Sequence, residues 1–369
     1  IILGNPKGDV VQQRKSRTAS YNEPVEERGR KVRKKKKWLV GMLVIVNVFL
    51  LFGCGKRQET RDDKVHIGVT YYNQSDTFLN ELLARFKEQL KNPEHEELEA
   101  TVTILDAAGS QRTQDDQVKE LIDMGCDVLC VNLVDRADPS EIIDLARDHD
   151  VPIIFFNREP VEEDLRQWDE LYYVGAEAKQ SGVMQGELAA EVIQKNTQID
   201  KNRDGKIQYV VLEGEAGHQD SIIRTGNAVD TIKNSGIELE KLSYQIANWN
   251  RVQAQNRMEQ LISQYQNKIE LVLANNDDMA LGAIDAYKKA NYTESAWPVF
   301  FGIDGTDAGL RALADSELSG TVYNDKEGQA KAMAKMVEAI GTDEEIAEKY
   351  VYLPYIKVTS ENIGEFLEK

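Results

Sequence analysis

The sequence predicts an α/β protein with two doubly wound parallel-sheet domains joined by a hinge. From Val65 onward, short apolar strands alternate with helical stretches, which is the pattern of right-handed βαβ units. The strands are β-branched and apolar throughout, as in parallel strands that helices cover on both faces. They are too numerous for one comfortable sheet, so two similar sheets are expected.

The first half of the pattern holds four strands and three helices. HIGVTYY, TVTILDA and DVLCVNLVD are followed by predicted helices over 77–91, 112–124 and 139–148, and the strand VPIIFFN comes next. Residues 65–151 together with 325–357 are expected to form the N-terminal lobe.

The second half begins after the short strand YYV and repeats the alternation. KIQYVVLEG, LSYQIANW, IELVLANND, WPVFFGIDG, SGTVYND and VYLPYIKV are its further predicted strands. Its predicted helices cover 178–195, 220–234, 251–266, 277–290 and 325–341, and a last short helix follows. Residues 152–324 with 358–369 are expected to form the C-terminal lobe, with hinge segments near 151–157, Asn324 and 355–358.

Polar and aromatic side chains follow the predicted strands where ligands bind in such sheets, at the carboxyl ends. A single Asn or Asp at this place is more often a helix cap or part of a turn. Many such residues at one edge of two sheets favour a binding site. This strand-end set comprises Asp76, Phe78, Asn132, His218, Asp220, Arg224, Trp249, Asn276, Asp304 and Asn324.

The chemistry of the strand-end set points to a sugar. Its Asp, Asn, Arg and His side chains can donate to and accept from hydroxyl groups. Its two aromatic rings can pack on the C–H faces of a pyranose. The sequence shows no Ser or Cys nucleophile beside a base, no His cluster for catalytic zinc and no GxGxxG for a dinucleotide. Binding without catalysis is therefore predicted.

The charge is divided unevenly along the chain. The net charge is −18, and residues 1–53 carry 12 Lys/Arg and 4 Asp/Glu, so the part from Cys54 onward carries −26. An acidic body repels nucleic acids and anionic membranes. A polyanionic ligand is not expected.

The front of the chain resembles a bacterial lipoprotein signal. A basic run over 33–37 precedes an apolar stretch over 38–52, which is shorter than the ~20 residues of a membrane-spanning helix. The stretch ends in LFGC, which resembles a lipobox, so 32–53 is predicted to be a signal peptide and Cys54 to be lipidated. An uncleaved signal anchor is the alternative. Residues 1–31 are expected to be a non-native or disordered extension, and 54–64 a tether.

A second motif, DKNRDGKIQ, begins like a calcium loop. Asp200, Asn202, Asp204, Lys206 through its carbonyl, and Gln208 stand at alternate positions with a glycine at the sixth. The bidentate carboxylate that an EF-hand needs at the twelfth position is missing. A plain turn is the alternative. Cys126 and Cys130 are about 13 Å apart on a predicted strand, too far for a disulfide, and are expected to be core thiols.

These motifs together resemble the bacterial D-galactose/D-glucose-binding proteins, the receptors of methyl-galactoside ABC transporters. The resemblance rests on IGVTYY with D-x-F behind it, NLVD, VPIIFFNREP, YYVGAEAKQSGVMQG, DxNxDGxIQ, EGEAGHxD, ANNDDMALGA, FGIDG and GTVYND. It runs from about residue 64 to 369. It implies a periplasmic-binding-protein type I fold and no enzymatic activity.

The resemblance also implies roles for particular residues. Glu270, just ahead of the ANND segment, supplies the missing carboxylate of a structural calcium site. Asp76 takes the hydroxyl that separates glucose from galactose, and Phe78 and Trp249 sandwich the ring. The other members of the strand-end set bind the remaining oxygens.

The expected protein is therefore a lipid-anchored, extracytoplasmic and monomeric receptor that delivers sugar to an ABC permease. A receptor for a chemotaxis or two-component sensor is an alternative that uses the same pocket. A sugar-responsive transcription regulator is a weaker one, because it needs a basic helix-turn-helix where this chain has a signal sequence.

Overall fold

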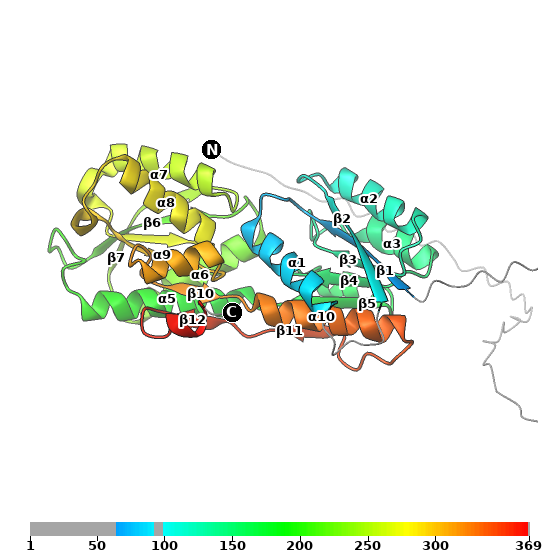
Figure 1. Ribbon diagram of the computed structural model, residues 1–369. Helices are drawn as coiled ribbons and strands as arrows, with labels where there is room; N and C mark the ends of the chain where they lie inside the picture. Colours follow the sequence, from blue (N-terminus) through cyan, green and yellow to red (C-terminus); the bar gives the residue numbers. More distant parts are fainter. Residues whose placement is uncertain (1–63, 92–98, 368–369) are drawn as a thin grey trace, which may run out of the picture. The chain divides into compact units, whose positions relative to one another are not determined.

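The computed structural model of the chain describes residues 64–91 and 99–367 (Figure 1). The predicted extension over 1–31, the signal peptide, Cys54 and nearly all of the tether lie outside this part. Within the described residues, no helix combines the length and the apolar character needed to cross a bilayer.

The first sheet has six parallel strands in the order β11-β5-β4-β3-β1-β2. Its strands are β1 (Lys64–Tyr71), β2 (Glu99–Asp106), β3 (Val128–Val131), β4 (Ile153–Phe156), β5 (Leu171–Gly175) and β11 (Tyr350–Tyr352). This sheet and its helices are called the first lobe. The helices are α1 (Thr77–Gln89), α2 (Gln111–Asp123), α3 (Ser140–Asp148), α4 (Glu162–Leu165) and α10 (Lys326–Gly341).

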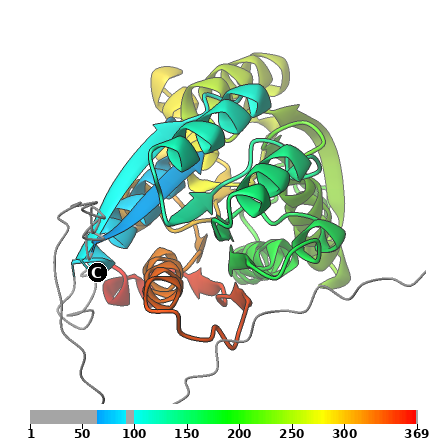
Figure 2. The same cartoon turned by 90° about the vertical axis from the view of Figure 1, so that its right-hand side faces the viewer.

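Helices cover both faces of this sheet, as the continuous apolar strands predict. On β3, Val128 and Cys130 belong to the core cluster that also contains the apolar faces of α1 and α10. Leu129 and Val131 point the other way, into the cluster formed with α2 and α3. Figure 1 shows α1 beside α10, and Figure 2 shows the sheet edge-on between its helices.

The second sheet has four parallel strands in the order β7-β6-β8-β9. They are β6 (Ile207–Glu213), β7 (Leu239–Ile246), β8 (Leu271–Ala274) and β9 (Val299–Phe301). β10 (Thr321–Tyr323) pairs antiparallel with β12 (Ile356–Val358) and reaches β9 through isolated bridges. This second lobe has the helices α5 (Ala178–Lys195), α6 (Gln219–Asn234), α7 (Arg251–Tyr265), α8 (Asp277–Lys289) and α9 (Asp307–Ala314).

The second lobe alternates its side chains as the first does. Leu271 and Leu273 of β8 pack in the cluster that contains residues of α5 and α6, while Val272 and Ala274 pack with α7 and α8. The fold class is thus confirmed: two parallel sheets, each between two layers of helices.

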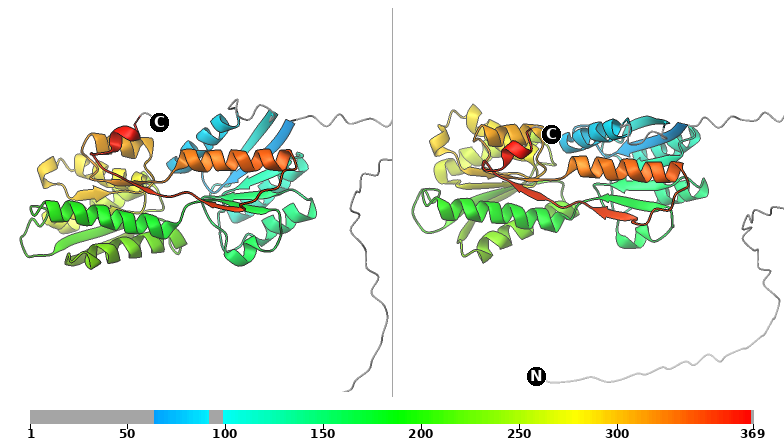
Figure 3. Two further views of the ribbon diagram at one scale, coloured as in Figure 1. Left: turned by 90° about the horizontal axis from the view of Figure 1, so that it is seen from below. Right: turned by 60° about the horizontal axis from the view of Figure 1, so that its bottom comes forward.

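The chain passes between the lobes three times, as predicted, but the first passage lies elsewhere (Figure 3). β4 and β5 pair with β3 and with each other in the first sheet, through Leu129↔Ile153 and Ile153↔Leu171. The passage therefore follows Gly175, and the predicted boundary at 151/152 with its hinge over 151–157 is wrong. The physical reason is that VPIIFFN is apolar on both sides and fills the sheet beside β3.

The other passages lie between Tyr323 and Lys326 and between Tyr352 and Ile356. The predicted strand VYLPYIKV is divided into β11 and β12, because Pro354 has no N–H and cannot continue a ladder. The sequence prediction also missed α9, which Thr306 caps by accepting a hydrogen bond from the N–H of Gly309 at 3.1 Å.

Both described cysteines are free and buried, as expected for core thiols. Burial raises the pKa of Cys126 to about 11 and raises that of Cys130 further. Neither thiol is a nucleophile at neutral pH.

Candidate functional site

The first lobe contributes Asp76, Phe78 and Asn132 from the carboxyl ends of β1 and β3. Asp76 is the N-cap of α1 and accepts from the N–H of Leu79 at 2.9 Å. Its second carboxylate oxygen accepts the hydroxyl proton of Tyr72 at 2.7 Å. Helix capping and a role in a site are therefore compatible here, because the cap uses only one lone pair of one oxygen.

Asn132 is fully buried and already well bonded within the protein. Its oxygen accepts from the N–H of Tyr72 at 3.3 Å, and its amide donates to the carbonyl of Phe156 at 3.0 Å. The structure places it at the predicted edge, where its amide also joins the ends of β1, β3 and β4.

The second lobe contributes the other seven members at the ends of β6, β7, β8, β9 and β10. His218 caps α6, Asn276 caps α8, and Asp220 and Arg224 lie on the first two turns of α6. Asn324, just after β10, is buried and accepts from the amide of Gln329 at 2.6 Å.

Trp249 is held against the end of β6 by a glycine. It has a φ of 58°, which is rare for a bulky side chain and marks a constrained turn. A Cβ built on Gly214 would lie 2.1 Å from the indole Cζ2. Only glycine at position 214 lets the indole lie there.

An aromatic and cationic cluster forms around this indole. The rings of His218 and Trp249 meet edge to face with centroids 5.4 Å apart, and the guanidinium of Arg224 lies 5.7 Å from the indole centroid. Three buried nitrogens of these side chains, His218 Nε2, Arg224 Nε and Trp249 Nε1, lack a hydrogen-bond partner within the described part of the chain. Unpaired buried donors are costly, and a ligand oxygen would relieve that cost.

The protonation of His218 follows from its surroundings. Burial, with help from the positive charges of Arg158 and Arg224, lowers its pKa to about 3, so the ring is neutral at physiological pH. Its Nδ1 accepts from the N–H of Asp220 at 3.2 Å. The proton therefore sits on Nε2, where the ring offers a donor.

Arg224 and Asp304 form a buried charge pair with an N–O distance of 3.8 Å. The guanidinium also donates to the carbonyl of Asn275 at 2.8 Å and to the hydroxyl of Tyr355 at 3.1 Å. Burial raises the pKa of Asp304 well above its ordinary value, and Arg224 partly opposes this shift. Burial likewise raises the pKa of Asp76.

Further residues at this edge were missed by the sequence prediction. The guanidinium of Arg158 lies 3.5 Å from the ring centroid of Tyr72 and pairs with Glu215 of the second lobe at 3.0 Å. Arg158 is the second residue after β4, so the strand-end rule could have found it.

Contacts between the lobes bring the two parts of the strand-end set together. Besides Arg158–Glu215, the hydroxyl of Thr77 donates to Asp278 at 2.6 Å. The charge of Asp76 also acts on Asp304 and Asp278, which shows that these carboxylates of different lobes share one neighbourhood. The arrangement can hydrogen-bond a polyol from two sides, and it holds no group poised as a nucleophile.

The predicted calcium loop lies in the second lobe, ahead of β6. Glu270 does lie against it, because its two oxygens accept from the N–H groups of Lys201 at 2.6 Å and Gln208 at 2.9 Å. Asp200 accepts from the N–H of Gly205 at 3.0 Å, where φ is 81°. The fold thus joins the loop to Glu270 across more than sixty residues of sequence.

The donor set of this loop suits a hard cation in type, since it consists of carboxylate, amide and carbonyl oxygens. Asn202, Asp204 and Gln208 are linked by side-chain hydrogen bonds, with Asn202 donating to Asp204 at 2.9 Å. Among the described residues, no three His, Cys, Asp or Glu side chains converge closely enough to hold a metal ion. The loop oxygens of this arrangement are instead turned to protein N–H groups.

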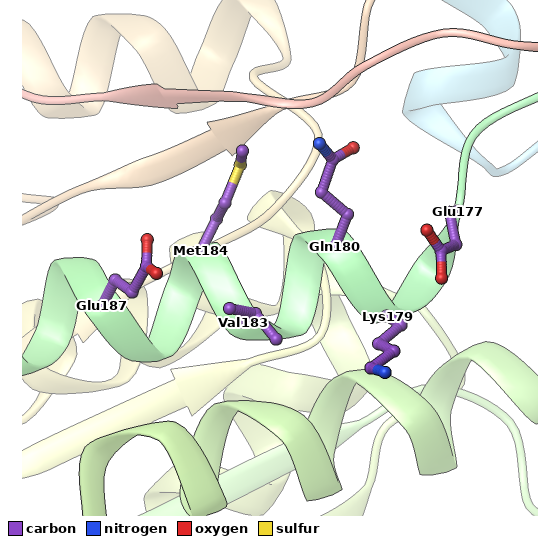
Figure 4. Close-up of a pocket in the computed structure, with 6 residues that line it drawn as sticks. All are labelled: Glu177, Lys179, Gln180, Val183, Met184 and Glu187. Carbon is purple, nitrogen blue, oxygen red and sulfur yellow. The ribbon is translucent and has the colours of Figure 1, made fainter. Parts of the chain in front are cut away.

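Two cavities of about 280 Å³ each lie at the N-terminal part of α5. One follows Glu177 and the first three turns of α5, and no member of the strand-end set lines it (Figure 4). The other is lined by Asp220 together with Asn157, Tyr173 and Gln219. Only the second therefore borders the candidate site.

Two lobes of this topology, with polar side chains from both at the carboxyl ends of their strands, define a solute-binding protein. The periplasmic binding protein domain family matches residues 67–345. The chain therefore belongs to the periplasmic binding protein family.

Two relatives indicate which members of the periplasmic binding protein family the chain is similar to. The chain is 34% identical, over 313 residues, to the D-galactose/methyl-galactoside binding periplasmic protein MglB of Haemophilus influenzae, covering 82% of this chain and 92% of that one. It is 33% identical, over 269 residues, to a putative rhizopine-binding protein of Rhizobium meliloti, covering 72% and 82%.

Solved structures agree with the fold. An ABC transporter solute-binding protein of Bacillus halodurans with bound myo-inositol aligns with a TM-score of 0.70 at 28% identity, covering 84% of this chain and 99% of that one. A galactofuranose-binding protein aligns with a TM-score of 0.71 at 21% identity, covering 83% and 98%. The chain is thus an extracytoplasmic binding protein and not an enzyme.

Proposed function

We propose that this protein captures D-galactose or D-glucose between its lobes and delivers the sugar to an ABC permease. The observation that carries the proposal is the set of buried, unpaired donors on His218, Arg224 and Trp249 of the second lobe, beside Asp304, a carboxylate on which Asp76 of the first lobe also acts. A sugar ring carries hydroxyl groups on both edges. Its oxygens would accept from these protein donors, and its O–H groups would donate to the carboxylates. The similarity to a D-galactose/methyl-galactoside binding protein supports a hexose.

In this proposal, different kinds of side chain bind different parts of the sugar. Asp76 accepts from the hydroxyl whose configuration separates the two hexoses, and Asp304 and Arg224 bind the opposite edge. Phe78 and Trp249 cover the two faces of the ring. Asn132, His218, Asp220, Asn276 and Asn324 complete the contacts to hydroxyls and ring oxygen.

Delivery requires the lobes to move relative to each other. Three chain passages, after Gly175, after Tyr323 and after Tyr352, form the hinge. A sugar that contacts both lobes favours the closed arrangement by those additional contacts. The closed form is what the permease recognises.

Two further features belong to the proposal. A lipid on Cys54, which lies outside the described residues, would anchor a monomeric receptor at the outer face of the membrane; stable anchoring needs two lipid signals. A calcium ion would be held by Asp200, Asn202, Asp204, Lys206, Gln208 and Glu270 once their oxygens turn from the N–H groups they now accept from, and it would neutralise three carboxylates and stabilise the second lobe.

Calorimetric titration with D-galactose, D-glucose, D-ribose and myo-inositol tests the choice of ligand. We expect saturable binding of both hexoses and weaker binding of ribose, which lacks the outer hydroxymethyl group of a hexopyranose. Binding of myo-inositol or ribose without binding of either hexose would contradict the assignment, while leaving the fold and the family unchanged.

A further inference from the structure

A buried lysine joins the two lobes where the first turns of α1, α9 and α10 come together (Figure 1). Lys326, the first residue of α10, is only 2% exposed. Its ammonium donates to Glu81 on the second turn of α1 and, at 2.8 Å, to Asp307 at the start of α9. Glu81 belongs to the first lobe and Asp307 to the second.

The backbone reinforces this contact. The N–H of Asp307 donates to both carboxylate oxygens of Glu81, at 3.1 and 3.3 Å. Glu81 therefore accepts from the second lobe's backbone and from the lysine at the same time. The N-terminus of α9 also offers a favourable place for a carboxylate.

The charge balance makes Lys326 essential to this contact. Burial lowers the pKa of Lys326, but the hydrogen bonds to Asp307 and Glu81 together outweigh it and keep the pKa above the ordinary value. Arg85, one turn further along α1, pairs with Glu88 at 3.1 Å and with Glu327 at 3.3 Å. Without Lys326, the carboxylates of Glu81 (19% exposed) and Asp307 (50% exposed), which belong to different lobes, would face each other with the charges of Arg85 and Arg311 as partial compensation at Asp307.

Each of the three helices starts next to a member of the strand-end set. α1 follows Asp76, α9 begins three residues after Asp304, and α10 begins two residues after Asn324. The contact of Lys326 with Glu81 and Asp307 thus fixes the segments that carry Asp76, Asp304 and Asn324 relative to one another, across both lobes.

We infer that Lys326 is a positioning residue for sugar binding, which holds the contact segments of the two lobes in register and favours the arrangement in which they face each other. It touches no sugar itself. The inference rests on the chain being a sugar-binding protein, but not on which sugar it takes.

The first test compares K326M with K335M in the full chain, using D-galactose. Lys335 is an exposed lysine on the same helix. K326M should weaken binding at least about tenfold, mainly through faster dissociation, because the two carboxylates repel and the lobes separate. K335M should bind like the wild type.

A rescue experiment separates positioning from simple loss of packing. In the triple variant E81Q/K326M/D307N the repulsion is gone and an amide oxygen at position 81 can still accept from the N–H of residue 307, so the affinity should return to within about threefold of the wild type. If K326M binds like the wild type, or if the triple variant stays as weak as K326M, the inference is wrong.

The second test needs no sugar and decides the inference even if neither hexose binds. Spin labels on K119C in α2 and Q260C in α7, with Cys54 replaced by serine, report the distance between the lobes. Cys126 and Cys130 are buried and remain unlabelled. In sugar-free protein, K326M should lengthen and broaden the distance distribution and the triple variant should restore it. Identical distributions for wild type and K326M would overturn the inference.

Discussion

The candidate sugar site, formed by the strand-end set, and the loop over 200–208 use similar residue types, but they differ in how their polar groups are bonded. At the candidate sugar site, His218, Arg224 and Trp249 keep buried donors that lack a partner among the described residues, and an ion pair between Arg158 and Glu215 joins the two lobes nearby. In the loop, Glu270 and Asp200 accept from neighbouring N–H groups of the same lobe. A ligand at the candidate sugar site therefore acts on the arrangement of the lobes, whereas an ion in the loop acts on the stability of one lobe.

Replacing Trp249 should give the largest effect on binding. Trp249→Ala removes the indole that covers one face of the ring, and we expect D-galactose affinity to fall by about 2–3 kcal/mol, roughly 30- to 150-fold. Isothermal titration calorimetry measures it.

Trp297→Ala is the matched control for this loss. That indole packs on Tyr287 and Phe300 behind α8, away from the strand-end set. It should lower the melting temperature with little change in affinity. Equal losses of affinity in the two variants would show that the candidate sugar site is not where the sugar binds.

Asp76 should give the next largest effect. Asp76→Asn keeps a good helix cap for α1 but removes the charged acceptor, so we expect a loss of about 1–3 kcal/mol in affinity for either hexose. Ser110→Ala, which removes the cap of α2, should lower stability by about 1 kcal/mol and leave affinity unchanged. A normal affinity for Asp76→Asn would remove this residue from the site.

Calcium should act on stability far more than on sugar affinity. Added calcium should raise the melting temperature relative to protein in chelator, because an ion that binds only the folded state stabilises it. Glu270→Gln should reduce this rise, and Asp230→Asn, an exposed carboxylate change on α6, should not. A melting temperature that is indifferent to calcium would make the loop a plain turn.

The smallest expected effect is the change in folding stability with pH that His218 causes. With a pKa of about 3 in the fold and about 6.5 when unfolded, the unfolded state binds more protons between these values. Stability should therefore fall as the pH decreases through this window. His218→Gln should flatten the fall between pH 7 and 5 in urea unfolding, whereas the same change at exposed His149 should not. If the stability of His218→Gln fell as steeply with decreasing pH as that of the wild type, this would contradict a buried, neutral His218 ring.

Local sequence patterns predicted much of the fold, because they report what each segment buries. The apolar runs of β3 and β8 require cover on both faces, and every member of the strand-end set lies at the end of a strand or in the first turns of the following helix. The missed helix α9 is short, and its only strong signal was Thr306 as a cap. The sequence prediction put the first passage between the lobes in the wrong place, because the apolar strand VPIIFFN is compatible with either sheet.

Pairings between distant residues could not be predicted in this way. Arg158 meets Glu215, and Lys326 meets Glu81 across 245 positions, only because the lobes are assembled. Nothing in the local sequence of α10 marks its first residue as buried. Glu270 was found through a family resemblance and not through spacing.

Hydrogen exchange with and without D-galactose tests the central claim most directly, since it reports both regions in one experiment. Sugar bound between the lobes should slow exchange in the segments that follow β1, β6, β8 and β9, which include Asp76, His218, Asn276 and Asp304. The loop over 200–208 should exchange alike in both conditions. Protection confined to one lobe, or protection in the loop instead of the candidate sugar site, would contradict the account.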